Sequence, residues 1–190
     1  MRNPVHTLVL VDVQNIYYGS LKYTSGQQQI DYARLMGVIR DELLSFYKGI
    51  RPEIAPYLEV NPEYRAYVVQ TPKSQGLWLF AFLRSLGYGL RFRDYEHGPE
   101  DKDKDWHGSV SNLMQMDILE YGPDFDAIVV VSGNGVFERV FKACQQNYPH
   151  VQCIIAAFDN TLHHTYTDNE WLTDHIIYLD DRVLRDRNGK

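Results

Sequence analysis

The stretch Leu8-Val9-Leu10-Val11-Asp12-Val13-Gln14-Asn15 decides the fold class, because an uninterrupted apolar run stops abruptly at a polar turn. A second stretch, Ile128-Val129-Val130-Val131-Ser132-Gly133-Asn134-Gly135, repeats this pattern. Short continuous runs of β-branched residues are typical of strands buried on both faces, as in a parallel sheet. Ligands of such sheets bind beyond the carboxyl ends of the strands, near the point where strand order reverses. We therefore expect Asp12 and Asn134 to lie at one site.

Strand-like and helix-like segments alternate along the rest of the chain, which predicts a mainly parallel sheet with right-handed crossovers and helices on both faces. The patterns predict strands over 7–12, 64–70, 88–95, 126–131, 151–157 and 175–179, and helices over 31–47, 74–86, 108–121 and 136–147. The proline-rich segment 49–63 is expected to be a loop or an irregular insertion, and the polar segment 96–106 is expected to be a loop. We expect one domain over residues 1–180, followed by a charged tail over 181–190 that frays from Arg182.

The composition limits the partners of the protein. A net charge of −6 argues against a general nucleic-acid coat protein but not against a nuclease, whose carboxylates add negative charge while a local basic strip holds phosphates. Candidates for that strip are Lys73, Arg84, Arg91, Arg93, Lys102 and Lys104, with ordinary solvated charge as the alternative. No apolar run reaches the roughly 20 residues of a membrane span. Two cysteines, Cys144 and Cys153, fit buried thiols in a reducing cytosol, so a cytoplasmic location is expected.

Single acidic residues in apolar surroundings are the candidates for chemistry. Asp12 follows an apolar strand, and a carboxylate buried without partners is costly, so a functional role is favoured over helix capping. Asp117 lies beside the apolar stripe of the predicted helix 108–121 and points either at a site or to solvent. His163-His164 reads as a surface pair.

Two other chemistries fit poorly. The turn Gly133-Asn134-Gly135 matches only the first half of the dinucleotide fingerprint, because Glu138 occupies the third glycine position. Aspartyl phosphotransfer would want a second acid two residues after Asp12, and Gln14 stands there.

Taken in order, these pieces resemble the NYN domain family, the LabA-like branch of the PIN-type nucleases. The resemblance rests on Asp12-Val13-Gln14-Asn15-Ile16-Tyr17-Tyr18-Gly19, on Asp117 in its helix, on Ser132-Gly133-Asn134-Gly135-Val136-Phe137, and on Leu172-Thr173-Asp174 before an apolar strand. It spans nearly the whole chain and implies a PIN-like three-layer α/β/α sandwich. It also implies a divalent-metal ribonuclease site built from aspartates, in which Mg²⁺ or Mn²⁺ activates water and neutralises phosphate charge.

Several positions depart from the family pattern. Asn134 and Val136 stand where the family has acids, and Ser111 stands where it has an aspartate six residues before the helical one. Asp105 could be a displaced form of that aspartate, since four extra residues make about one helical turn. The resemblance thus implies Asp12, Asp117 and Asn134 as catalytic and metal-binding residues, with Asn15, Ser132, Ser111 and Asp105 in support.

The lost negative charges predict weak binding of Mg²⁺ or Mn²⁺. The leading hypothesis is therefore a ribonuclease with a partly degraded acidic site, with Lys73, Arg91, Arg93, Lys102 and Lys104 binding RNA. The alternatives are a non-catalytic module that binds RNA or a protein through the same cleft, and a homodimeric regulatory protein whose cleft is vestigial.

Overall fold

Six parallel strands form the central sheet of the protein, in the order β4-β3-β1-β5-β6-β7. The computed structural model describes residues 3–70, 77–94, 107–169 and 172–187. The sheet strands are β1 (Asn3–Asp12), β3 (Leu58–Gln70), β4 (Gly89–Asp94), β5 (Ala127–Val131), β6 (Gln152–Phe158) and β7 (His175–Leu179). The helices are α1 (Val13–Tyr23), α2 (Tyr32–Ile50), α3 (Leu77–Ser85), α4 (His107–Tyr121), α5 (Glu138–Asn147) and α6 (Thr165–Asp168). The predicted parallel sheet is confirmed.

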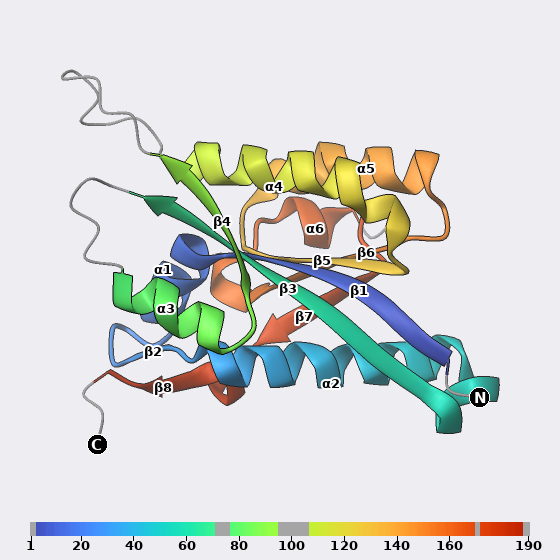
Figure 1. The fold of residues 1–190 in the computed structure, drawn as a ribbon, viewed down its shortest axis with the longest axis horizontal. Helices are drawn as coiled ribbons and strands as arrows, with labels where there is room; N and C mark the ends of the chain where they lie inside the picture. The colour runs from blue at the N-terminus through green and yellow to red at the C-terminus, as the bar shows by residue number, and fades with distance from the viewer. Residues whose placement is uncertain (1–2, 71–76, 95–106, 170–171, 188–190) are drawn as a thin grey trace.

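Helices cover both faces of the sheet, so the protein is a three-layer α/β/α sandwich. Figure 1 shows α4 and α5 on one side and α2 and α3 on the other. Alternate residues of each central strand feed the two layers. On β1, Val9 and Val11 pack in the layer of α1 to α3, and Leu8 and Leu10 pack in the layer of α4 and α5. Burial on both faces explains why these strands appear in the sequence as continuous apolar runs.

Strand order reverses between β1 and β5. From β1 the chain builds outward through β3 to β4 and then returns to the other side of β1 with β5, β6 and β7. Parallel pairing of β1 with β5 runs from Thr7 opposite Ala127 to Val11 opposite Val131. The polar turns that follow Val11 and Val131 therefore lie side by side at the carboxyl edge of the sheet. This is the position at which open α/β sheets bind ligands.

Most of the predicted elements appear with small shifts at their ends. Helix α2 begins where the predicted helix 31–47 does, and the Asp31 carboxylate caps it by accepting hydrogen bonds from the backbone N–H groups of Ala33 and Arg34 at 3.0 and 3.1 Å. The two cysteines are buried free thiols on α5 and β6, as expected. The predicted loop over 96–106 and the predicted helix start at Ser74 lie outside the described residues. Within the described residues no helix is long and apolar enough to cross a membrane.

The prediction that 49–63 is a loop or an irregular insertion is wrong. A 3₁₀ helix covers Pro52–Tyr57, and β3 already begins at Leu58, with Pro62 inside the strand opposite Thr7. Pairing of β3 with β4 starts only at Arg65, so among the described residues the first half of β3 has β1 as its only neighbour in the sheet. Proline is tolerated on such an edge segment because it has one neighbouring strand and not two.

Part of the expected frayed tail is ordered. Strand β8 (Leu184–Asp186) pairs antiparallel with β2 (Gln28–Ile30), a short strand that the sequence did not predict. Val183 and Leu184 are buried in the same layer as α2. Two buried apolar side chains within a charged segment hold this segment against the body of the protein. The division into a domain and a tail stays a prediction.

Candidate functional site

Asp12 ends β1 and begins α1, and it is only 1% exposed. Its Oδ1 accepts a hydrogen bond from the backbone N–H of Asn15 at 3.0 Å, which makes Asp12 the N-cap of α1. A carboxylate at this position is stabilised by a helix donor and by the positive end of the helix dipole. Capping and function were alternatives for Asp12 in the sequence, and the structure shows that the residue does cap its helix.

The turns after β1 and β5 are joined by a side chain. Asn15 Oδ1 accepts a hydrogen bond from the backbone N–H of Gly133 at 2.8 Å. Ser132 is fully buried, and its Oγ accepts the N–H of Asn134 at 3.3 Å. Asn134 Oδ1 in turn accepts the N–H of Val136 at 3.1 Å and caps the 3₁₀ helix Gly135–Phe137. The two polar turns thus form one connected structure beside the point where strand order reverses.

Close packing fixes the second turn from the other side. A Cβ at Gly133 would overlap the carbonyl oxygen of Thr161, and one at Gly135 would overlap the His163 ring. The Gly133 carbonyl also accepts the N–H of His163 at 2.9 Å. Both glycines are therefore required by close approach of the Thr161 backbone and the His163 ring. His163 and His164 are exposed and stacked on each other, as expected for a surface pair.

A shallow pocket adjoins the joined turns. It has a volume of about 200 Å³ and is lined by Asn15, Tyr18, Gly19, Lys22 and Thr161. The Lys22 ammonium donates to the carbonyl of Asn160 at 3.1 Å and brings a positive charge to this pocket. The sequence analysis missed Lys22, although its spacing of seven residues from Asn15, about two helical turns, places both on one side of α1.

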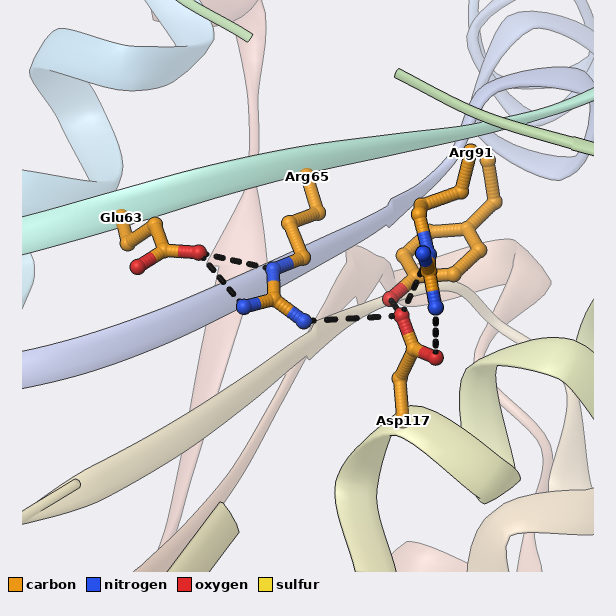
Figure 2. Close-up of polar contacts among 5 residues, drawn as sticks. Glu63, Arg65, Arg91 and Asp117 are labelled. Atoms are coloured by element: carbon orange, nitrogen blue, oxygen red, sulfur yellow. Dashed lines mark hydrogen bonds and ion pairs between the residues drawn. The ribbon is translucent and has the colours of Figure 1, made fainter. Parts of the chain in front are cut away.

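Asp117 is also 1% exposed, but its surroundings differ from those of Asp12. Arg91 binds its carboxylate in a bidentate manner, with Nη2 2.6 Å from Oδ1 and Nε 2.9 Å from Oδ2. The Tyr67 hydroxyl donates to Oδ2 at 2.6 Å, and Arg65 Nη1 lies 3.5 Å from the same oxygen. Figure 2 shows Arg65 between Asp117 and Glu63, with Arg91 facing the carboxylate. Both Asp117 oxygens are therefore taken by cations or hydroxyl donors.

This cluster of Glu63, Arg65, Tyr67, Arg91 and Asp117 is balanced in charge and held in place. Arg65 Nη2 lies 2.7 Å from Glu63, and its guanidinium lies 4.4 Å from the centre of the Tyr121 ring. Hydrogen bonding to Asp117 raises the pKa of Arg91 despite the opposing effect of burial. Burial, followed by the hydrogen bond to Asp117, raises the pKa of Tyr67, so the phenol stays protonated as a donor.

The remaining predicted site residues are only partly placed. Ser111 is buried on α4, on the same helix face as Met114, Asp117 and Ile118. Arg93 is exposed at the end of β4, whereas Arg91 is committed to Asp117. Asp105, Lys73, Lys102 and Lys104 lie outside the described residues. Arg65 and Tyr67 were missed, although each alternates with apolar residues on β3, a pattern that places them on the face of α4.

The NYN domain family model matches residues 6–178. The chain belongs to the NYN domain family. A protein of unknown function from Vibrio parahaemolyticus has a crystal structure similar to this NYN chain, with a TM-score of 0.70 at 22% identity over 95% of this chain and 96% of the other. At this identity the likeness shows a shared fold.

Two further comparisons add little about the NYN chain. A Staphylococcus aureus homoserine dehydrogenase matches with a TM-score of 0.36 at 13% identity, over 94% of this chain and 33% of that one. This similarity is too weak to indicate a shared fold. No curated protein matches the chain.

The donor set for a divalent cation is small. Within the described residues no three His, Cys, Asp or Glu side chains are grouped to hold a metal ion. Asp12 offers a carboxylate at the strand end, but Asp117 would have to give up Arg91 and Tyr67 before it could bind a cation. Magnesium sites that rely on substrate phosphates use as few as one or two protein carboxylates. The described residues therefore fit a weakly held ion at Asp12 and do not fit one held jointly by Asp12 and Asp117 in this arrangement.

Proposed function

We propose that this NYN protein is a metal-dependent ribonuclease with a reduced acidic site centred on Asp12. The observation that carries the proposal is the connected pair of turns: a buried carboxylate ends β1, and Asn15 ties its helix to the Ser132–Asn134 turn at the reversal of strand order. Membership of the NYN family, whose domains are PIN-like, supports RNA phosphodiester bonds as the substrate class. Assignment to the LabA-like branch remains a prediction.

The proposed roles follow from the contacts. Asp12 would hold Mg²⁺ or Mn²⁺, which supplies water activation and neutralises phosphate charge. Asn15 positions the two turns, and the Asn134 amide oxygen, now bound to Val136, contributes no charge. Lys22 and the exposed Arg93 bring positive charge to neighbouring surface for the RNA backbone. Asp117 would act by holding the guanidinium groups of Arg65 on β3 and Arg91 on β4 in place.

The test is cleavage of a fluorescein-labelled single-stranded RNA in Mg²⁺, in Mn²⁺ and in EDTA. Asp12→Asn keeps an oxygen for the Asn15 N–H but removes the charge, so it should lower metal-dependent cleavage by about 100-fold, the usual loss when a charge-stabilising group is removed. Asn134→Asp should increase cleavage because it adds a carboxylate beside the turn.

Asp126→Asn is the matched control. Asp126 precedes β5, and its Oδ2 accepts the N–H of His6 at 2.8 Å, at the opposite edge of the same sheet. Cleavage should be unchanged in this variant. Cleavage that persists in EDTA, or that survives Asp12→Asn undiminished, would refute the proposal.

A second candidate function is a non-catalytic RNA-binding module, and the pairing of Asp117 with Arg91 favours it specifically. Under this reading Asp117 serves as the structural partner of Arg91, and the cleft has no use for a second acid. Asn134→Asp would then leave cleavage absent and weaken RNA binding, because the added charge repels phosphate. The same two assays, cleavage and binding, therefore separate the two functions.

A further inference from the structure

A second, larger pocket lies beside the start of α1, and five of its eleven lining residues are aromatic. Its volume is about 260 Å³, close to the lower end of the range of roughly 300–1,000 Å³ for small-molecule sites. Its walls come from α1, the start of α2, α3 and the β2–β8 pair and include Gln14, Tyr17, Tyr32, Trp78, Phe82 and Arg185. A volume of this size suits one flat ring system.

Two polar atoms on the side chains that line this pocket are buried without a hydrogen-bond partner among the described residues: Gln14 Oε1 and Arg185 Nε. Buried polar atoms are nearly always paired, because leaving one unpaired costs free energy. One atom is an acceptor and the other is a donor. A ligand that carries both a donor and an acceptor offers each atom a partner, and a purely apolar ligand offers none.

The aromatic side chains supply surfaces for stacking. Tyr17 and Tyr18 meet edge to face with ring centres 5.4 Å apart, and both line the pocket. Trp78 on α3 is 65% exposed, an unusual state for a large apolar ring. Exposed aromatic rings beside a positive charge are the features with which proteins stack unpaired bases.

The pocket lies next to the proposed active site. Gln14 follows Asp12 by two residues, and the Tyr32 hydroxyl, which lines the pocket, donates to the carbonyl of Val13 at 3.2 Å. Burial raises the pKa of Tyr32, the charge of Asp12 raises it further, and Arg185 lowers it. The charges of Asp12 and Arg185 therefore shift the pKa of Tyr32 in opposite directions. Both charges must lie close to the Tyr32 hydroxyl, so the end of β1 is a neighbour of the pocket.

We propose that this pocket binds one nucleobase of a single-stranded RNA, stacked against Trp78 and the tyrosines and hydrogen-bonded to Gln14 and Arg185. The inference rests on the proposed function for its substrate class. It adds a pocket in which the protein holds the RNA by one base, while an adjacent phosphate of the RNA lies towards Asp12. Every nucleobase carries neighbouring donors and acceptors, so the site is proposed for a base and not for one base in particular.

The test is binding measured by fluorescence anisotropy in EDTA, so that cleavage plays no part. The probes are a labelled single-stranded RNA of about ten nucleotides and an abasic ribose-phosphate oligomer of the same length. Wild-type protein should bind the RNA more tightly than the abasic oligomer. Trp78→Ala should weaken RNA binding about 5- to 100-fold and leave binding of the abasic oligomer unchanged.

Gln14→Leu separates a binding role from a structural one. Replacing an unpaired buried acceptor by an apolar group should leave the melting temperature equal or higher, whereas RNA affinity should fall. Tyr57→Ala is the matched control for Trp78→Ala: Tyr57 is 60% exposed but precedes β3, at the opposite edge of the sheet, and its loss should not change affinity.

Two outcomes would overturn the inference. Equal affinity for RNA and abasic oligomer, or full affinity in both Trp78→Ala and Gln14→Leu, would show that the pocket does not hold a base, while Asp12-dependent cleavage could still stand. If RNA is neither bound nor cleaved, the proposed function fails. Fluorescence quenching by nucleoside monophosphates then decides whether the pocket binds a base. Quenching that is present in the wild-type protein and absent in Trp78→Phe would show that it does. Absence of that quenching would overturn the pocket as well.

Discussion

Asp12 and Asp117 are buried to the same degree, each 1% exposed, yet their carboxylates lie in different structural settings. The Asp12 carboxylate accepts a backbone N–H at the start of a helix and acts there as the N-cap. Asp117 is bound by two guanidinium groups and a phenol, which balance its charge. The comparison shows that burial of an acid does not by itself indicate a metal ligand. The charge of its neighbours decides whether a cation is still attracted.

The largest expected effect is on stability, at Asp117. Asp117→Ala leaves Arg65, Arg91 and the Tyr67 hydroxyl without their shared acceptor. Removing one partner of a buried ion pair leaves charge uncompensated, so the variant should lower the free energy of unfolding by about 3 kcal/mol. Urea denaturation measures this loss. Asn112→Ala on the exposed face of the same helix is the control and should change stability by less than about 0.5 kcal/mol. A loss at Asp117 no larger than the control's would mean that the cluster does not stabilise the fold.

The tie between the two turns should have the next largest effect. Asn15→Ala removes the acceptor of a part-buried Gly133 N–H and should cost about 1–2 kcal/mol. It should also speed amide hydrogen exchange at Gly133, which NMR can follow residue by residue. Asn160→Ala, with an exposed side chain, serves as control. Unchanged exchange at Gly133 would show that the turns are held without Asn15.

Asp12 should contribute less to stability than Asp117, and this difference sharpens the comparison. Asp12→Ala removes a helix cap and should cost about 1 kcal/mol, the typical value for such a loss. Asp12→Asn keeps the cap oxygen and should cost less. If thermal melting shows Asp12→Ala to be as damaging as Asp117→Ala, then Asp12 has a structural role equal to that of the arginine-bound acid.

The smallest effect concerns pH and lies away from both aspartates. His175 on β7 stacks on Phe46 with ring centres 4.9 Å apart, and burial lowers its pKa, against an opposing effect of Glu42. The unfolded chain then binds a proton more readily than the folded protein, so stability falls as pH falls below about 6.5. Because the ring is only half-buried, the loss should stay well under about 1 kcal/mol. His175→Phe should flatten the unfolding free energy between pH 7 and 5; an unchanged slope would assign the dependence to another group.

Much of the fold could be predicted from the sequence because it depends on local patterns. Continuous apolar runs predicted β1, β5 and β6, and Asp31 predicted the start of α2. Pro62 misled the prediction because its tolerance depends on where β4 begins to pair, which is a long-range property of the sheet. The pairing of β2 with β8 joins residues more than 150 positions apart, and neither short strand has a pattern of its own.

The part of the candidate site that lies at strand ends could be predicted, because the ends of the strands could be predicted. The polar residues after β1 and β5 do come together, through Asn15 and Gly133. The ion pairing of Asp117 could not be predicted, because Arg65, Arg91 and Asp117 come from three separate elements and their contact depends on side-chain direction across the sheet. The placement of Asp12, Asp117 and Asn134 at one metal site stays a prediction.

The pairing of β8 with β2 has a consequence for the order of events during synthesis. Gln14 and Tyr17 leave the ribosome early, whereas Arg185, which lines the same pocket, leaves much later. The pocket beside Asp12 therefore cannot be completed until β8 has paired with β2, even if the sheet from β1 to β7 has already assembled. A nascent chain would carry the acid of the proposed active site before it could bind a base, so the pairing of β8 with β2 would be the step that makes the protein competent to hold RNA.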